Sequence, residues 1–319
     1  MNILGIETSC DETSAAVVTD GSVLRSNIVA SSLPDHQRFG GVIPEIASRR
    51  QLEYISIVVN EALSHAGLRK EDLDAIAVTL KPGLIGSLLV GISFAKAFSK
   101  ALAKPFIGVN HVHAHIYANC LRKAEASREA EPVLPAIGLA VSGGHSSLYF
   151  IRDFRSFKLI GETRDDAAGE AYDKVARILG LGYPGGPVID KIARSVKNNT
   201  LRFKCAQLEG SYDFSFSGIK TAVLYHVREH HVQPGPETDC VVAAFQESVV
   251  ASLVEKSLLA CRKKKVGTLL VGGGVSANSA LRSLLSSRAQ QEGIRVFFPP
   301  FELCTDNAAM IAGLAFHYY

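Results

Sequence analysis

The stretch that decides the fold is Asn2-Ile3-Leu4-Gly5-Ile6-Glu7, followed by the polar loop Thr8–Ser14 and the apolar run Ala15–Thr19. Two apolar runs on either side of a short polar loop predict a β-hairpin. A similar pair, Ala136–Val141 and Ser146–Ile151 around a glycine-containing loop, opens the second half of the chain. We therefore predict two duplicated domains that each offer one loop to a shared cleft.

Strands and helices alternate along the rest of the chain, which is the pattern of an α/β fold. A helix is predicted from Pro44 to the glycine at position 67, because Ile55, Val58, Val59, Ala62 and Leu63 recur on one helical face. The other predicted strands are Ala75–Leu80, Phe106–Val109, Thr268–Val271 and Ile294–Phe298. The other predicted helices are Ile85–Leu102, Ala168–Leu181, Val188–Val196, Gly218–His230, Val241–Lys264, one from about Asn278 and one from Asp306.

Composition places the chain among ordinary globular proteins. It has 319 residues, of which 47% are hydrophobic and 20% charged, and this length favours two domains. The formal net charge of +3 permits a nucleic-acid partner without requiring one.

No feature of the sequence indicates secretion or a membrane. The six cysteines are widely spaced without a CxxC pair, which favours reduced thiols. The amino terminus lacks the basic region of a signal peptide, and the apolar stretch Gly83–Ala95 is interrupted by Lys96. We expect a cytoplasmic protein with no membrane partner.

A histidine cluster, Asn110-His111-Val112-His113-Ala114-His115, is the first candidate site. On a helix, His111 and His115 lie four residues apart on one face and can bind one metal ion. The metalloprotease motif HExxH is absent because Val112 follows His111, so peptidase chemistry is disfavoured. A cluster of ordinary surface or core histidines is the alternative.

Asp306, near the end of the chain, is the second candidate. Its carboxylate could complete a site of two histidines and one carboxylate with open positions for a ligand. As an alternative, Asp306 could cap the last helix.

Three glycine-rich segments, Ser142–His145, Tyr183–Pro187 and Gly272–Asn278, can bring backbone N–H groups close to an anion. None matches the Walker lysine motif or GxGxxG. Each alone is compatible with a simple tight turn, but three of them in an α/β chain indicate a nucleotide. Asp173 could accept a sugar hydroxyl if its helix lines the cleft, or belong to a solvated helical face.

Together the motifs resemble one family, the TsaD/Gcp proteins, which are the catalytic subunits of tRNA threonylcarbamoyladenosine synthesis. The stretches that carry this resemblance span nearly the whole chain in order: Gly5–Thr13, His36–Glu45, Val109–His115, Val141–His145, Gly169–Lys174, Tyr183–Pro187, Phe214–Lys220, Gly272–Asn278 and Cys304–Met310.

The resemblance implies an actin/hexokinase/Hsp70-like (ASKHA) fold with a nucleotide cleft between two domains. It implies transfer of a threonylcarbamoyl group from its adenylate to N6 of adenosine 37 in tRNAs reading codons that begin with A. The charged, alanine-rich stretch Arg122–Glu131, followed by Pro132 and Pro135, predicts a connection at 122–135. It would join one domain at 1–121, with the carboxy-terminal helix 304–319, to a second at 136–303.

Carried over position by position, the resemblance implies two sets of site residues. His111, His115 and Asp306 would bind a divalent metal, with iron expected and zinc or magnesium as alternatives. From the chemistry of the transfer rather than from the resemblance, we expect Asp11 or Glu12 to act in catalysis by orienting the incoming amine or tuning the metal. ATP or threonylcarbamoyl-adenylate would contact Ala140, Val141, Ser142, Gly143, Gly144, Asp173, Gly186, Asp190 and Asn278.

The expected partners are tRNA, a TsaB-like paralogue and a TsaE-like ATPase. Three alternative functions remain: an actin-like ATPase or sugar kinase that transfers a phosphoryl group, a metalloendopeptidase, and a nucleotide-binding scaffold without turnover.

Overall fold

The computed structural model describes residues 1–37, 39–123, 131–206, 208 and 210–319. Arg38 of the stretch His36–Glu45, and residues 124–130 of the predicted connection, lie outside these described residues. The chain divides into two compact units, Met1–Pro132 with Pro299–Tyr319 as unit 1 and Val133–Phe298 as unit 2. The predicted bounds of the functional domains stay a prediction.

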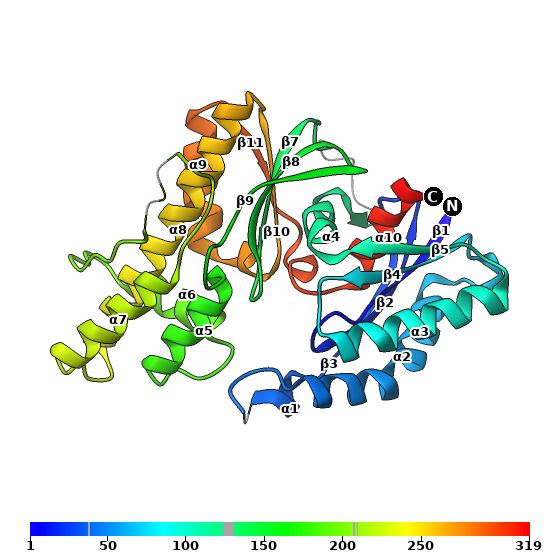
Figure 1. Cartoon of the computed structure of the whole chain (residues 1–319), viewed down its shortest axis with the longest axis horizontal. Coiled ribbons are helices and arrows are strands. Elements are labelled where there is room, and N and C mark those ends of the chain that lie inside the picture. Colours follow the sequence, from blue (N-terminus) through cyan, green and yellow to red (C-terminus); the bar gives the residue numbers. More distant parts are fainter. Residues whose placement is uncertain (38, 124–130, 207, 209) are drawn as a thin grey trace. The chain divides into compact units, whose positions relative to one another are not determined.

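Unit 1 contains a mixed sheet with helices against it (Figure 1). Its strands are β1 (Asn2–Glu7), β2 (Glu12–Thr19), β3 (Val23–Ser31), β4 (Ala75–Lys81), β5 (Phe106–Asn110) and β6 (Arg122–Lys123). Its helices are α1 (Leu33–Gln37), α2 (Pro44–Ala66), α3 (Ile85–Leu102), α4 (His111–Tyr117) and α10 (Ala308–Ala315).

The sheet of unit 1 has the order β5-β4-β1-β2-β3-β6. The predicted hairpin is confirmed, because β1 and β2 pair antiparallel with Glu7 opposite Ser14. β4 runs parallel to β1, and β5 runs parallel to β4. The carboxyl ends of β1, β4 and β5 therefore meet at one edge of the sheet, where polar side chains from distant parts of the sequence converge.

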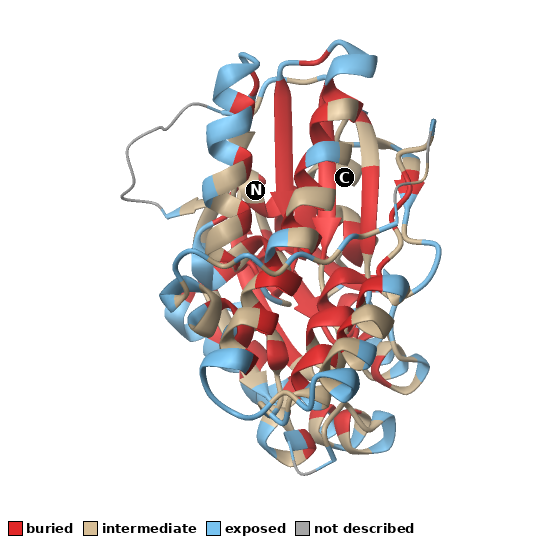
Figure 2. Ribbon diagram, turned by 90° about the vertical axis from the view of Figure 1, so that its left-hand side faces the viewer, coloured by how far each residue is buried: buried red, intermediate tan, exposed pale blue. Residues whose placement is uncertain are grey.

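Both faces of this sheet are covered. Leu4, Ile6 and Val17 pack on one face with Ile55 and Val59 of α2. The apolar helix α10 packs on the other face against β1 and β2, and all eight of its residues are buried. Figure 2 shows the buried residues concentrated in the strands and the exposed residues along the outer helices. Burial on both faces explains why β1 and β2 are almost continuously apolar.

Unit 2 repeats this topology. Its strands are β7 (Ala136–Val141), β8 (Ser146–Asp153), β9 (Ser156–Glu162), β10 (Thr268–Gly272) and β11 (Arg295–Phe297). Their order, β11-β10-β7-β8-β9, matches β5-β4-β1-β2-β3 of unit 1 strand for strand. In both units the first three strands are antiparallel neighbours and the last two run parallel to the first. The prediction of duplicated α/β halves is confirmed at the level of topology.

The helices of unit 2 are α5 (Ala168–Ile178), α6 (Gly185–Ser195), α7 (Ser217–Glu229), α8 (Pro236–Lys264) and α9 (Ser279–Gln291). The long helix α8 lies at the centre of their packing and contacts α6, α7 and α9. Its side chains Phe245, Val249 and Leu253 are fully buried with Leu139 of β7 and Leu269 of β10.

The predicted helices all occur, with shifts at their ends. The helix from Pro44 ends as predicted, because Gly67 takes a left-handed conformation with φ 66°. α6 begins three residues before the predicted Val188, and α8 begins at Pro236 rather than Val241. β3, β6, β9 and α1 were not predicted. β3 and β9 are third strands with mixed burial, which weakens the apolar pattern, and α1 and β6 are only five and two residues long.

Most of the apolar stretch Gly83–Ala95, which Lys96 interrupts, lies in the predicted helix Ile85–Leu102. Within the described part of the chain, one helix, α3 (Ile85–Leu102), is long and apolar enough to cross a membrane by length and composition. It packs against β4 and α2, and its small residues Ser87, Gly91 and Ala95 are buried. Because α3 packs against the sheet, it has the position of the helices that cover sheets in α/β proteins.

Candidate functional site

The histidines predicted to bind a metal lie on a short helix that begins where β5 ends. Asn110 caps this helix, since its side-chain oxygen accepts hydrogen bonds from the N–H groups of Val112 at 2.9 Å and His113 at 3.2 Å. His111 and His115 are therefore one helical turn apart, and both are buried. The helical arrangement proposed from the spacing is confirmed.

Asp306 is held just before α10. Asn307, not Asp306, caps this helix, because the Asn307 side chain accepts from the Met310 N–H at 3.1 Å. The alternative in which Asp306 is the cap is therefore wrong. α10 reaches β1 closely, since a Cβ built on Gly5 would lie 2.3 Å from the Ala308 carbonyl oxygen. This close packing brings Asp306 to the same edge of the sheet as the histidines.

The three predicted ligands converge within unit 1. His115 Nε2 lies 3.1 Å from His111 Nε2 and 3.1 Å from Asp306 Oδ1. His111 Nε2 lies 3.5 Å from the same carboxylate oxygen. Two ligand atoms that each lie about 2.1 Å from one ion are about 3.0 Å apart at an octahedral angle and about 3.4 Å apart at a tetrahedral angle. The observed separations fit one ion bound by all three residues.

A second carboxylate, that of Glu7, contacts the ring nitrogen of His111 that does not face the proposed metal ion. It was not identified from the sequence. Glu7 is fully buried at the end of β1, and its Oε2 lies 2.9 Å from His111 Nδ1. The same carboxylate accepts hydrogen bonds from the Ser9 N–H and the Thr79 hydroxyl, both at 2.5 Å. A carboxylate at Nδ1 fixes the tautomer that leaves the Nε2 lone pair for a ligand, as in carboxylate–histidine–metal sites. The residues present therefore fit a metal ion.

The pKa values in this group follow from burial and neighbouring charges. Burial opposes ionisation of Glu7, but His111 outweighs it and holds the Glu7 pKa below its usual range. Burial likewise opposes the charged form of His111, but Glu7 and Asp306 outweigh it and raise the His111 pKa to about 9. Burial and the charge of His111 lower the pKa of His115. Two carboxylates facing two imidazoles make a centre suited to a cation.

The loop that carries Asp11 and Glu12 is fixed by buried side chains of α2 and α3. Gln51 donates a hydrogen bond to the Cys10 carbonyl at 2.9 Å, and Ser87 donates to the same oxygen at 3.1 Å. Glu12 is the first residue of β2, so the strand begins earlier than the predicted Ala15. Burial and the neighbouring Asp11 raise the Glu12 pKa to about 7, with a smaller contribution from Asp306.

Unit 2 holds the residues predicted to contact a nucleotide. Ala140 and Val141 are the buried end of β7, and Ser142, Gly143 and Gly144 form the turn that follows. A Cβ built on Gly143 or Gly144 would meet nothing within 4 Å, so their backbones face open space. The beginning of α5 adjoins this turn, because the Gly169 N–H donates to the Ser142 carbonyl at 3.1 Å.

Asp173 contacts the predicted glycine segment directly. Its carboxylate accepts a hydrogen bond from the Gly185 N–H at 2.7 Å, at the start of α6. Burial raises the Asp173 pKa, against the hydrogen bond from Gly185. Gly186 follows in the first turn of α6, where a Cβ would meet nothing within 4 Å. Asp173 therefore fixes the start of the helix that carries Gly186 and Asp190.

Asp190 and Asn278 are linked by a buried residue that the sequence analysis did not identify. The Gln246 side chain of α8 donates to Asp190 Oδ1 at 3.3 Å and accepts from Asn278 Nδ2 at 2.7 Å. Ser279 Oγ also donates to Asp190, at 2.8 Å. Asn278 additionally caps α9 by accepting from the Leu281 N–H. Two residues far apart in the sequence thus belong to one polar network.

Different signals could have pointed to the two missed residues. Glu7 is the one acid at the end of an otherwise apolar strand, and a buried acid requires a partner. Gln246 lies between Phe245 and Glu247 on a long helix and carries no motif of its own. Glu7 could therefore have been proposed from the sequence, and Gln246 could not.

Solved structures share this fold. Full-length HypF in its phosphate- and nucleotide-bound form superposes with a TM-score of 0.64 at 15% identity, over 99% of this chain and 46% of HypF. Component A of the Acidaminococcus fermentans (R)-2-hydroxyglutaryl-CoA dehydratase gives 0.54 at 14% identity, over 100% and 98% of the two chains. The fold is that of the ASKHA class of α/β proteins, here carrying a His-His-Asp group that could hold a metal.

Sequence comparison identifies the family within this class. The family model TsaD, described as tRNA N6-adenosine threonylcarbamoyltransferase, matches residues 23–313, and the chain belongs to this family. The enzyme of that name from Moorella thermoacetica is 52% identical over 322 residues, covering 100% of this chain and 92% of that protein. The one from Clostridium botulinum is 50% identical, covering 100% and 93%. The resemblance seen in the motifs is confirmed.

Proposed function

We propose that this chain uses the His111, His115 and Asp306 centre of unit 1 and the nucleotide residues of unit 2 to transfer a threonylcarbamoyl group to tRNA. The chain is a transferase of the tRNA N6-adenosine threonylcarbamoyltransferase family. In the proposed reaction, N6 of adenosine 37 attacks the carbamoyl carbon of threonylcarbamoyl-adenylate. The new N–C bond forms, the C–O bond to the adenylate phosphate breaks, AMP leaves, and the amine loses one proton.

The proposal rests mainly on the convergence of the three ligands, together with the contact of Glu7 with His111 Nδ1. Two imidazoles and one carboxylate are a donor set that suits iron(II) or zinc better than magnesium, which prefers oxygen ligands. We propose iron as the resident metal. A bound divalent ion supplies Lewis-acid stabilisation of negative charge on a phosphate or carbamoyl oxygen.

The adenylate is proposed to bind to unit 2. In the open turn Ser142–Gly144, the Ser142 N–H donates to the His145 carbonyl at 2.8 Å, so the Gly143 and Gly144 N–H groups are the ones offered to the phosphate. Charge that develops on the leaving group would be stabilised there. Asp190 and Asn278 would contact the adenosine, held in place by Gln246. ATP could occupy the same residues.

Asp11 and Glu12 are the proposed catalytic residues. The Glu12 carboxyl is half-buried, and one of its oxygens accepts from Ser31 Oγ at 2.9 Å. A carboxyl with a pKa of about 7 can accept a proton near neutral pH. We assign Glu12 to receive the proton from the adenine amine, and Asp11 to orient that amine.

Partner proteins are proposed from an apolar surface on unit 1. The large side chains of Leu52 and Ile57 on α2, and of Ile85 and Leu89 on α3, are each more than half exposed. Large exposed apolar side chains on two helices that pack together point to a protein–protein interface. We propose that a TsaB-like paralogue covers them, that a TsaE-like ATPase completes the assembly, and that the complex works in the cytoplasm.

The test is incubation of the chain and its partners with threonylcarbamoyl-adenylate and unmodified tRNA, followed by mass spectrometry of the nucleosides. We expect threonylcarbamoyladenosine with the unaltered chain. His111→Ala and His115→Ala should each lower bound metal and reduce the rate by about 100-fold or more, with the fold intact. His113→Ala, on the same helix, is the control that should keep the metal.

Two outcomes would contradict this function. Unchanged metal stoichiometry in the His111→Ala, His115→Ala double variant would refute the centre. ATP hydrolysis without dependence on tRNA, and without a modified nucleoside, would favour the ATPase or sugar kinase alternative.

A further inference from the structure

A basic segment of unit 2 has no role in the reaction described above. Between residues 191 and 204 the sequence contains five cations and no acid. All five side chains are exposed: Lys191, Arg194, Lys197, Arg202 and Lys204. The chain as a whole carries a net charge of only +3, so this segment is a local concentration of positive charge.

Of these five side chains, Arg194 and Arg202 already have partners in unit 2, and the three lysines can bind an external anion. Arg194 pairs with the buried Asp190 at 2.5 Å. Arg202 donates to the Asn199 carbonyl at 2.6 Å and lies 3.4 Å from Glu247. Within the described part of the chain, the three lysines form no ion pair. Exposed lysines without carboxylate partners can bind an external anion without breaking a contact.

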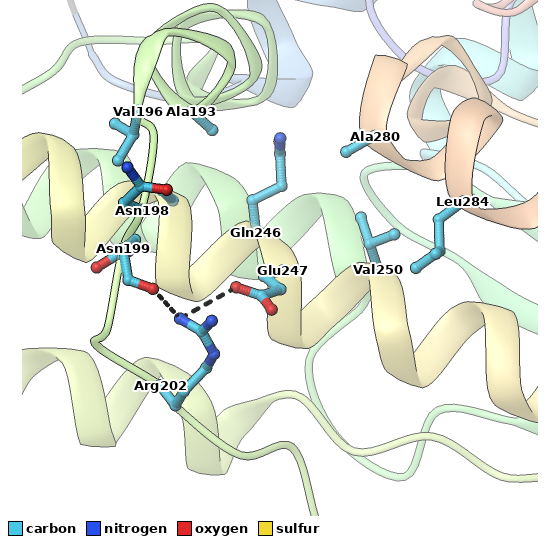
Figure 3. Close-up of a pocket in the computed structure, with 11 residues that line it drawn as sticks. Ala193, Val196, Asn198, Asn199, Arg202, Gln246, Glu247, Val250, Ala280 and Leu284 are labelled. Carbon is cyan, nitrogen blue, oxygen red and sulfur yellow. Dashed lines mark hydrogen bonds and ion pairs between the residues drawn. The ribbon is translucent and has the colours of Figure 1, made fainter.

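A cavity of about 370 Å³ adjoins this segment. Figure 3 shows Arg202 and Asn199 on one side of it, Gln246 and Glu247 on α8, and Ala280 on α9. Its wall combines the amides of Asn198, Asn199 and Gln246 and the Arg202–Glu247 ion pair with aliphatic side chains. An apolar wall with a few fixed polar groups is typical of pockets that bind small organic groups. A cavity of this size has room for one nucleobase.

The cavity shares a wall with the candidate nucleotide network. Gln246 lines the cavity and also bonds to Asp190 and Asn278. Ala280, on the α9 side, directly follows Ser279, which donates to Asp190. The basic segment continues from the helix that carries Asp190. A polyanion bound along this segment would therefore lie beside the proposed adenylate site.

We propose that residues 191–204 and the adjoining cavity form an RNA-binding surface, in which the lysines contact phosphates and the cavity holds one unpaired base of the tRNA. This inference rests on the proposed function and adds the surface that the tRNA contacts. A row of cations supplies salt-dependent affinity for phosphates. Unstacked bases of RNA loops are recognised by hydrogen bonds to their edges and by stacking on aromatic rings or arginine guanidinium planes. In this cavity the amides could supply the hydrogen bonds and Arg202 the guanidinium plane.

The test is binding of unmodified tRNA to the full chain, followed by fluorescence anisotropy at several salt concentrations. Lys191→Ala, Lys197→Ala and Lys204→Ala are combined in one variant. Each lost phosphate contact lowers the slope of log K against log salt by about 0.7 to 0.9. We expect affinity to fall roughly 100-fold at about 0.1 M salt and the slope to fall by about 2 to 3.

The matched control combines Lys158→Ala, Lys263→Ala and Lys264→Ala, which removes the same charge from exposed lysines elsewhere in unit 2. This control should bind tRNA with nearly the affinity of the unaltered chain. Equal loss in both triple variants, or loss in neither, would overturn the proposal. Circular dichroism melts identify any variant that fails to fold.

A second variant tests the cavity without changing charge. Ala280→Leu places three extra carbons in the cavity and should weaken tRNA binding about tenfold, because the added side chain takes the space of the base. The salt slope should stay unchanged, because no charge is removed. Ser286→Leu, exposed on the same helix, is its control. Unchanged affinity for Ala280→Leu would remove the cavity from the proposal.

The nucleoside assay separates the two proposals. If tRNA is modified while the lysine variant binds as well as the unaltered chain, the surface is wrong and the function stands. If the surface binds tRNA as expected and no modified nucleoside forms, the function is wrong.

Discussion

At the scale of single residues, the candidate metal centre depends on a residue that is not itself a ligand. Glu7 contacts His111 Nδ1 and is held by the Ser9 N–H and the Thr79 hydroxyl, all in the interior of unit 1. These contacts orient the imidazole before any ion binds. The centre therefore has the support that separates a built metal site from three residues that happen to be close.

We predict that Glu7→Gln weakens metal binding by about 10- to 100-fold, the usual effect of removing such a support. The amide cannot accept from all the groups that now donate to the carboxylate, so His111 loses its fixed tautomer. Metal titration followed by calorimetry measures the effect. Glu302→Gln is the control, because Glu302 lies near Asp306 in the sequence but pairs with Lys123 at 3.1 Å. Equal affinities in the two variants would contradict the role of Glu7.

Glu12 gives a prediction about pH. Its pKa of about 7 exceeds the ordinary value of 4.5, so the folded protein binds more protons there than the unfolded chain does between these pH values. Stability therefore falls as the pH rises from 4.5 to 7, and the full loss is present above pH 7. Glu12→Gln removes this loss.

In the presence of a chelator, we expect Glu12→Gln to raise the Tm at pH 8 by about 6–12 °C. The shift of the Glu12 pKa from 4.5 to about 7 corresponds to about 3 kcal/mol, and about 1 kcal/mol shifts the Tm of a unit of this size by about 2–4 °C. The gain should shrink towards zero as the pH falls to 4.5. Thermal melts across this range check the prediction, and Glu61→Gln, exposed on α2, should show no such trend. A gain independent of pH would show that burial of the charge is not the cause.

At the scale of elements, the position of Asp306 depends on how α10 packs against β1. Gly5 has no side chain at the point where α10 passes, and Ser14 Oγ accepts from the Ala308 N–H at 2.9 Å. Because Asp306 lies two residues before α10, a small movement of this helix moves the carboxylate away from the histidines.

Gly5→Ala tests this link between packing and the centre. The new Cβ would lie 2.3 Å from the Ala308 carbonyl oxygen, so α10 must shift. We expect a loss of about 1–3 kcal/mol in the free energy of unfolding and weaker metal binding. The control is Gly86→Ala on α3, where the new Cβ would contact only the Ser48 side chain, at 3.4 Å or more. This variant should keep both the stability and the metal affinity of the unaltered chain. Denaturant unfolding and metal titration measure the two effects, and intact metal binding in the Gly5 variant would contradict the argument.

At the scale of the whole molecule, the two units have separate cores and separate candidate sites. The metal ligands all belong to unit 1, and the polar network of Asp190, Gln246 and Asn278 belongs to unit 2. Ligand binding to one unit stabilises the state that binds, by about 2.7 kcal/mol when the ligand is present at 100 times its Kd.

Removal of the metal should therefore loosen unit 1 selectively. With a chelator, we predict faster hydrogen exchange in α4 and in residues 304–315, and unchanged exchange in the buried part of α8. Hydrogen-exchange mass spectrometry with and without added metal measures this difference. Equal loss of protection in α8 would show that the ion does not act through unit 1.

Much of the fold and part of the site could be predicted from the sequence. The two hairpins were predicted from pairs of apolar runs on either side of a short polar loop. The helix from Pro44 was predicted from its apolar face and its end at Gly67, and the helical turn at His111–His115 from the four-residue spacing. Such patterns are visible without knowledge of distant contacts. The family resemblance came from short motifs of the same kind.

What only the tertiary structure decided is which distant residues meet. The sequence suggested Asp306 both as a helix cap and as a ligand; packing of α10 on Gly5 and capping by Asn307 resolved this choice. The contact of Glu7 with His111 joins side chains from separate elements. The same holds for the hydrogen bonds of Gln246 to Asp190 and Asn278. Local sequence determines how a segment folds, but burial of the sheet faces determines which segments lie together, and that cooperative packing leaves no short-range pattern.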